Sequence, residues 1–427
     1  MEHMQLGLRH NRSQVAQQLL QVLLVGMTVG LMRNVLPALA ETEFGLPRGS
    51  FLLMVTFVVA FGLVKGGMNL IAGRLAEQQG RQKVLLLGWL VAWPIPLLIY
   101  FSTNWNWIVL ATLLLGVNQG LTWSMTQTSA LDLTKPQQRG LVIGLNEFAG
   151  YLGVALAGIA TAYAATWLGA RAGLLWFGAA VILLGTWLTV YAVVESQPWN
   201  LLHNSHSPVH DGLPLSTGQI FALMSWGDRR LVALTQAGLV EKFVDALVWM
   251  IWPLYLVQRG LTLTDIGWVL SSYGITWGVA QLATGYFSDV IGRHKLNWMG
   301  MWLCGAGVAL FPLSGNAIEW AASAALSGLG MAMLYSNLSA AVADLAGSAW
   351  RASAIGIYSF WRDLGYAVGA LGIGLTAQLS GNLDNSFWFV AISMWLSGSL
   401  LAWFGHNDSR LQRSGVPQDS DQRPLRD

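Results

Sequence analysis

The sequence has little charge for its length. Lys, Arg, Asp and Glu together make up 10% of the 427 residues, against roughly a quarter of the residues in soluble domains. Apolar residues make up 54% of the chain, and the mean hydropathy is +0.50. This composition excludes an ordinary soluble globular protein and predicts a membrane protein.

The chain also lacks the motifs of soluble active sites. Its single cysteine, Cys304, excludes an intrachain disulfide and a Cys-x-x-Cys site. No glycine-rich phosphate-binding loop is present, so we expect no enzyme, no cofactor and no nucleic-acid partner. His203, His206 and His210 share a polar stretch, but no cysteine or carboxylate cluster completes a site there. We expect a solvated linker and no metal.

The sequence is rich in long hydrophobic runs. About twelve apolar stretches have the ~20 residues that a helix needs to cross a hydrocarbon core of ~30 Å. The runs are continuous and do not alternate, which favours helices over a barrel. With the N-terminus inside, the outer loops hold only Arg48, Arg171 and Arg259 among the basic residues. The positive-inside rule therefore predicts a multi-pass protein of the cytoplasmic (inner) membrane, with both termini cytoplasmic.

The hydrophobic runs form two groups of six. A polar stretch containing Pro198, Pro208 and Pro214 separates them and is typical of a linker. The predicted organisation is a cytoplasmic N-terminus at 1–16, six helices in 17–194, a cytoplasmic linker at 195–229, six helices in 230–404 and a cytoplasmic tail at 405–427.

A short charged string occurs twice, 212 positions apart. Each copy joins two apolar runs, so each is predicted to be a tight, glycine-containing turn between two helices. The register continues to residue 153 and maps Asp132 on Asp344 and Arg139 on Arg351. Such a duplication is typical of a transporter with parallel repeats. The two copies are Gly73, Glu77, Gly80 and Arg81 and, in the same order, Gly285, Asp289, Gly292 and Arg293.

The repeated string resembles the signature turn between helices 2 and 3, and 8 and 9, of the major facilitator superfamily. The resemblance covers residues 17–404 and is to the prokaryotic, twelve-helix type. It implies an all-α membrane protein with two pseudo-symmetric six-helix bundles around a central cavity, working by alternating access. In that architecture Glu77 would approach Arg351 and Asp289 would approach Arg139 across the two bundles. These pairs and the two repeated turns would form a cytoplasmic gate, which comprises Gly73, Glu77, Gly80, Arg81, Arg139, Gly285, Asp289, Gly292, Arg293 and Arg351. The alternative is that the basic residues are only topology signals in wet loops.

Eight charged residues fall inside the apolar runs, four of each sign. An intramembrane charge is costly unless it is paired or hydrated, so each is a functional candidate. Glu241 and Asp245 share one helix face and are the first candidates for carrying a proton, with Glu147 and Asp363 as further candidates. An internal salt bridge between Asp245 and Lys242 is an equally good explanation. The eight are Arg33, Lys65, Glu147, Glu241, Lys242, Asp245, Arg362 and Asp363.

Polar and aromatic residues at similar depth are candidates for binding the solute, with core packing as the alternative for each aromatic residue. The resemblance implies that the second and eleventh helices are neighbours, and depth along these helices then predicts a salt bridge between Lys65 and Asp363. The loss of either partner would leave a buried charge alone. The candidates for binding are Arg33, Lys65, Arg362, Asn69, Trp123, Trp249, Tyr273, Trp277, Tyr358 and Tyr366.

These features predict a secondary active transporter for a small organic solute. We expect it to be proton-coupled, with efflux slightly favoured over uptake, and to act as a monomer in the lipid bilayer. The first alternative is a facilitator or exchanger of organic anions, in which Arg33, Lys65 and Arg362 bind the negative group without proton coupling. The second is a transporter-like receptor or scaffold, although a receptor would usually add a sizeable cytoplasmic domain.

Overall fold

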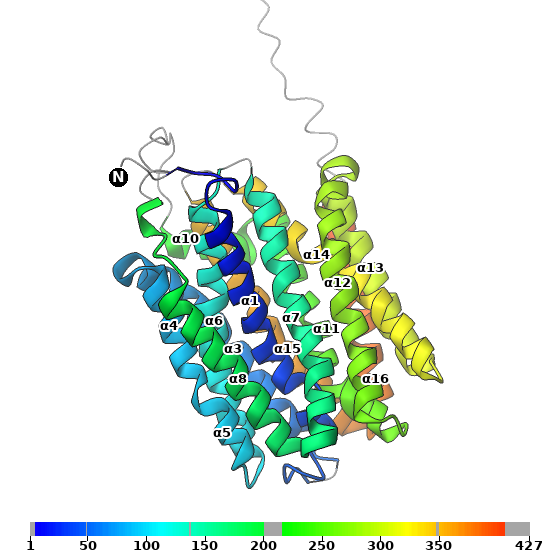
Figure 1. The fold of residues 1–427 in the computed structure, drawn as a ribbon. Helices are drawn as coiled ribbons and strands as arrows, with labels where there is room; N and C mark the ends of the chain where they lie inside the picture. The colour runs from blue at the N-terminus through cyan, green and yellow to red at the C-terminus, as the bar shows by residue number, and fades with distance from the viewer. Residues whose placement is uncertain (1–4, 48, 136–137, 200–215, 347–349, 406–427) are drawn as a thin grey trace, which may run out of the picture.

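The computed structural model describes residues 5–47, 49–135, 138–199, 216–346 and 350–405 (Figure 1). In these segments the chain is helical and contains no strand. The first half consists of α1 (Arg12–Arg33), α2 (Val35–Ala38), α3 (Phe51–Gln79), α4 (Arg81–Ala92), α5 (Pro94–Tyr100), α6 (Trp105–Asp132), α7 (Arg139–Leu168) and α8 (Ala170–Tyr191).

The second half begins with two short elements, α10 (Thr217–Ala222) and the π-helical turn η2 (Leu223–Gly227). The long helices that follow are α11 (Arg229–Gln258), α12 (Leu263–Ile291), α13 (Arg293–Leu310), α14 (Ala317–Leu345), α15 (Arg351–Ser380) and α16 (Asp384–Gly405). A 3₁₀ turn, η3 (Phe311–Leu313), lies between α13 and α14.

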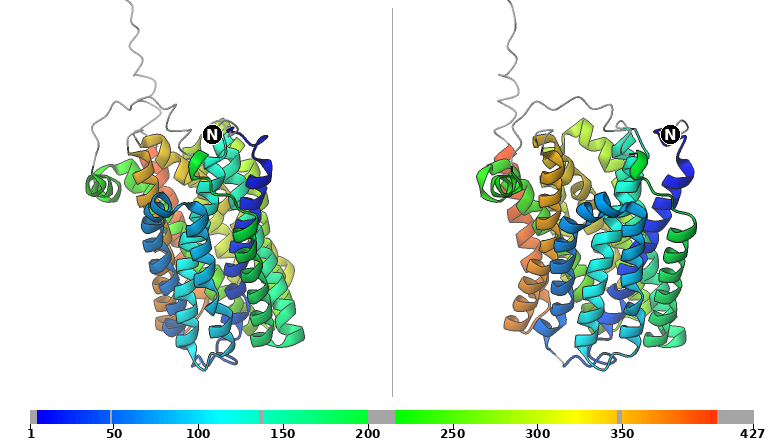
Figure 2. Two further views of the ribbon diagram at one scale, coloured as in Figure 1. Left: turned by 60° about the vertical axis from the view of Figure 1, so that its left-hand side comes forward. Right: turned by 90° about the vertical axis from the view of Figure 1, so that its left-hand side faces the viewer.

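The long helices run side by side along one axis (Figure 2). Nine helical segments of the described part are long and apolar enough to cross a membrane. The other three long helices are α11, α12 and α15; α11, for example, carries Glu241, Lys242 and Asp245 in its middle. Helix α1 begins and α16 ends at the same end of the bundle (Figure 2), which we call the terminal face.

The turn of each repeat lies at Gly80 or Gly292. Both glycines have positive φ values, 91° and 95°, which side chains with a Cβ rarely adopt. The prediction that Gly73 and Gly285 also belong to the turn is wrong. Gly73 lies inside α3 and Gly285 inside α12, because each helix continues to within a residue of the turn glycine and so keeps its backbone hydrogen-bonded.

The duplication is visible in how the helices pack. A Cβ on Gly116 of α6 would touch the backbone of Phe61 in α3, and one on Gly328 of α14 would overlap the backbone of Tyr273 in α12. These two contacts are 212 positions apart, so the shared register extends back to residue 61. Each repeat therefore pairs its second and fourth long helices through a glycine in the same way.

The two halves meet through crossed pairs of helices. Helix α3 packs against α15, and α7 packs against α12. Gly66 faces Phe360 in the first pair, and Gly278 faces Phe148 in the second. Gly66 corresponds to Gly278, and Phe148 to Phe360, at the 212-residue offset. The two contacts are therefore equivalent, and they give the two halves a pseudo-two-fold arrangement around the site described next.

Candidate functional site

A cavity of about 740 Å³ lies between the halves. Leu131 and Leu141 from the ends of α6 and α7, and Arg293 from the start of α13, also line it, so the cavity reaches the terminal face. Its polar and aromatic wall comes from both halves and comprises Lys65, Asn69, Trp123, Ser124, Gln127, Glu147, Gln281, Tyr335, Ser336, Asn337, Ser339, Ser359, Arg362 and Asp363.

The first charged group at the cavity surrounds Asp363 of α15. Asn69 Nδ2 donates to Asp363 Oδ2 at 2.6 Å, and Arg362 Nε donates to Oδ1 at 3.0 Å. Lys65 Nζ lies 3.6 Å from Oδ2, so the pair predicted from helix depth is present. This group joins α3 of the first half to α15 of the second.

The second charged group is buried behind the first around Asp245 of α11, which is 0% exposed. Lys242 Nζ lies 2.8 Å from Asp245 Oδ2, and Arg33 Nη2 lies 3.4 Å from Oδ1. The hydroxyls of Tyr273 and Tyr366 each donate to the same carboxylate at 3.0 Å. The structure therefore contains the salt bridge with Lys242 that the sequence left open.

The two glutamates lack comparable partners. Both oxygens of Glu241 are buried without a hydrogen bond from any described residue, and Lys242 Nζ lies 4.0 Å away. Glu147 Oε1 accepts a hydrogen bond from Trp123 Nε1 at 3.0 Å, whereas Oε2 has no partner in the described part of the chain. Of the two, only Glu147 lines the cavity.

Most of the predicted binding aromatics pack behind the cavity wall. Trp249 is 0% exposed, and its Nε1 donates to the Met32 carbonyl across the halves at 3.1 Å. Trp277 stacks on Tyr151 with ring centroids 3.5 Å apart. Of the ten candidates, Lys65, Asn69, Trp123 and Arg362 line the cavity. The other six lie in this buried layer: Arg33, Trp249, Tyr273, Trp277, Tyr358 and Tyr366.

Two residues of the cavity wall were not among the sequence candidates, although the repeat could have predicted them. Tyr335 corresponds to Trp123 and Gln281 to Asn69 at the 212-residue offset. Since the halves surround one cavity, a wall residue in one repeat predicts a wall residue at the equivalent position of the other. Applying the register to the candidates would have found both.

The repeated turns form equivalent ion pairs within each half. Arg81 Nε lies 3.0 Å from Asp132 Oδ2, and Arg293 Nη1 lies 3.1 Å from Asp344 Oδ2. Ser196 Oγ also donates to Asp132 Oδ2. The first pair is buried, whereas Arg293 and Asp344 retain 33% and 60% of their side chains exposed.

The predicted gate pairs stay predictions. The side chains of Arg139, Asp289 and Arg351 lie outside the described residues, and the described side chain of Glu77 is exposed.

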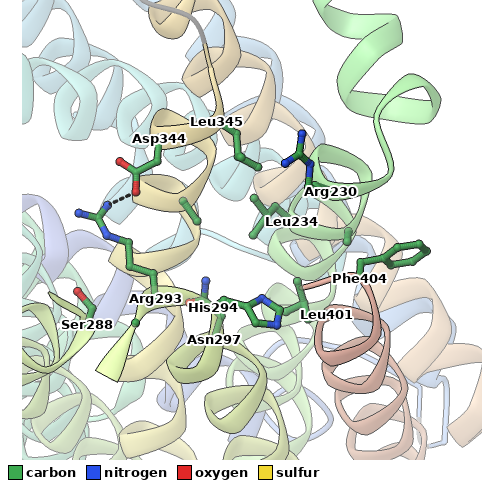
Figure 3. Close-up of a pocket in the computed structure, with 13 residues that line it drawn as sticks. Arg230, Leu234, Ser288, Arg293, His294, Asn297, Asp344, Leu345, Leu401 and Phe404 are labelled. Atoms are coloured by element: carbon green, nitrogen blue, oxygen red, sulfur yellow. Dashed lines mark ion pairs between the residues drawn. The ribbon is translucent and has the colours of Figure 1, made fainter. Parts of the chain in front are cut away.

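A second pocket, of about 450 Å³, lies at the terminal end of the second half. Figure 3 shows Arg293 directed toward Asp344 on one side of it, with Arg230 on another. Asn297 lines this pocket, is 0% exposed, and has no hydrogen-bond partner for its amide in the described part of the chain. No cluster of three metal-ligating side chains occurs among the described residues, and the three linker histidines lie outside them.

Comparison with known proteins agrees with this architecture. The sequence model of the Major Facilitator Superfamily matches residues 19–240 and again 234–427. An uncharacterised MFS-type transporter of Salmonella typhimurium strain LT2, STM4428, is 24% identical over 328 residues, which cover 73% of this chain and 75% of the relative. The chain therefore belongs to the major facilitator superfamily and is a multi-pass membrane transporter.

Proposed function

We propose that the protein moves a small organic solute across the cytoplasmic membrane by alternating access and couples this movement to protons. In this proposal the terminal face is cytoplasmic, because the basic loops lie on that side. The central cavity open to this face would then be the solute site in an inward-facing state. We take efflux as the working direction, because this cavity would receive its solute from the cytoplasm.

The observation that carries the proton coupling is the setting of Glu147. Glu147 lines the cavity and is 3% exposed as a residue. Among the described residues its Oε1 accepts a hydrogen bond from Trp123, and its Oε2 has no partner. A carboxylate in such a place can take up and release a proton as its access to water changes. Asp245, in contrast, contacts two cations and two hydroxyls, so we assign it a structural role at the interface of the halves.

The test uses proteoliposomes that contain a pH-sensitive dye. Solutes that stabilise the purified protein in a thermal-shift screen are added to one side, and proton movement and solute movement are both recorded. Glu147→Gln should abolish solute-driven proton movement and gradient-driven accumulation while sparing solute exchange at equal pH. Glu319→Gln, which removes an exposed carboxylate at the start of α14, is the matched control and should behave as the parent.

Three outcomes would contradict parts of the proposal. Proton movement at the parental rate in Glu147→Gln would show that this residue is not the carrier. Solute movement without proton movement in the parent would favour the uncoupled facilitator. Solute accumulation inside vesicles, driven by an inward proton gradient through protein oriented as in the cell, would reverse the working direction.

A further inference from the structure

The side chains that a solute can touch in the central cavity carry excess positive charge. Lys65 and Arg362 keep 11% and 13% of their side chains exposed, whereas the side chain of Asp363 between them is 0% exposed. Both cations line the cavity. The other charged residues of the wall are Glu147, which is 3% exposed, and Arg293, whose side chain is 33% exposed. A solute that enters therefore meets cations first, and the carboxylates are more deeply buried.

Asp363 uses only part of the binding capacity of these cations. Arg362 donates to it through Nε, and its two terminal nitrogens have no hydrogen bond to a described residue. Lys65 Nζ, at 3.6 Å, is beyond ordinary hydrogen-bond length and donates to no other described group. A guanidinium edge with two free donors matches the two oxygens of a carboxylate, and a neighbouring ammonium adds a point charge.

The ion pairs of the site have two cations for each aspartate. Lys65 and Arg362 share Asp363, and Lys242 and Arg33 share Asp245. Around Asp245 a second carboxylate accompanies the second cation, because Glu241 Oε1 lies 4.0 Å from Lys242 Nζ. Around Asp363, neither cation forms an ion pair with a second carboxylate among the described residues. The group around Asp363 therefore has one positive charge in surplus when Asp363 is ionised. This surplus faces the cavity, where an added anion could neutralise it.

The remaining wall suits a polar solute of modest size. Trp123 and Tyr335 present aromatic surface, and the Tyr335 ring centroid lies 4.9 Å from Arg362 Cζ. Gln281 is 2% exposed, lines the cavity, and has no hydrogen-bond partner for either amide atom among the described residues. A buried amide without a partner is costly, so a hydroxyl or amide group of the solute would stabilise it.

We propose that the transported solute is a small organic acid bound as its anion. Its carboxylate is held by the terminal nitrogens of Arg362 and by Lys65, and a hydroxyl or amide group on its body binds Gln281. The inference rests on the proposed transport function only in taking this cavity as the solute site; it does not depend on proton coupling.

The test measures binding to the purified full-length protein in lipid nanodiscs at one fixed pH. The probes are lactate, gluconate and 4-hydroxybenzoate, each matched with its neutral amide, and the readout is the concentration dependence of thermal stabilisation. At least one acid should stabilise the protein while its amide does not. Arg362→Lys keeps the charge beside Asp363 but loses the two-donor edge, and it should weaken binding of that acid about tenfold or more.

Two further variants complete the design. Lys65→Gln should also weaken binding about tenfold or more, since it removes a charged donor. Lys83→Gln removes an exposed positive charge outside the cavity, at the start of α4, and should leave the Kd unchanged. No stabilisation by any of the three acids, equal stabilisation by an acid and its amide, or an unchanged Kd in Arg362→Lys would each overturn the assignment.

The two proposals fail separately. Acid binding that survives while Glu147→Gln transports with full proton coupling would refute the coupling role and leave the substrate class standing. Coupled transport of a neutral or cationic solute would do the reverse.

Discussion

Lys65 and Asp363 are unequal partners, so replacing them should destabilise the protein by different amounts. In Lys65→Met, Asp363 retains Arg362 at 3.0 Å and Asn69 at 2.6 Å. The loss is then that of one charged interaction at 3.6 Å, about 1–2 kcal/mol. In Asp363→Leu, two largely buried cations lose their shared anion, and the cost should be roughly 3–5 kcal/mol. The sequence alone predicts that the loss of either Lys65 or Asp363 leaves one buried charge alone, because it does not reveal that Arg362 and Asn69 also contact Asp363.

The double variant Lys65→Met with Asp363→Leu tests the coupling directly. It leaves Arg362 as the one cation of the group without its anion, so it should be about 1–2 kcal/mol more stable than Asp363→Leu alone. The free energy of unfolding is measured by titration with sodium dodecyl sulfate in mixed micelles and followed by circular dichroism. Lys83→Met, at an exposed position, controls for the loss of a lysine.

Two results would refute this reasoning. If Lys65→Met is as destabilising as Asp363→Leu, the remaining donors do not sustain the carboxylate. If the double variant is no more stable than Asp363→Leu, Lys65 and Asp363 do not interact in the folded protein.

Two more predictions follow from the packing of the halves. Trp249→Phe removes the hydrogen bond from Trp249 to the Met32 carbonyl, which joins the two halves beyond the cavity. Hydrogen–deuterium exchange of residues 34–40 should then speed up roughly 2–10-fold. Unchanged exchange would show that this bond does not hold the two halves together. Gly153→Ala places a Cβ against the Leu23 carbonyl and should lower the free energy of unfolding. In Gly144→Ala, in the same helix, the added Cβ meets nothing within 4 Å, so this change should raise the free energy of unfolding by about 0.5–1 kcal/mol. Equal effects of the two variants in the detergent titration would contradict this packing.

The fold was predictable because it depends on signals that are local or periodic. Hydrophobic run length predicts membrane helices, and the repeated string predicts two related halves. The pairing of Lys65 with Asp363 was predictable from their charges and their depth along the helices, since helix rise is constant, once the resemblance to the major facilitator superfamily had made the two helices neighbours. The place of Gly73 and Gly285 was not predictable from glycine content, because a helix inside a membrane gains from continuing as far as its backbone hydrogen bonds can be kept.

The wall of the cavity was only partly predictable. Arg33, Trp249 and Tyr366 have the same depth and residue chemistry as the residues that reach the cavity, but they face neighbouring helices and are buried. Helical spacing tells which side chains share a face, but not what that face contacts. Rotation of a helix about its own axis is set by packing, chiefly where glycines allow close approach.

The sequence by itself determined that eight charges lie inside membrane helices and that the two halves repeat, because both follow from residue type and position along the chain. Only the tertiary structure decided how these charges are shared. It places Asp363 behind Lys65 and Arg362, seals Asp245 among four donors, and leaves Glu147 on the cavity wall without a described cation. Residues far apart in the chain make these contacts, and their consequence depends on which atoms water and solute can reach.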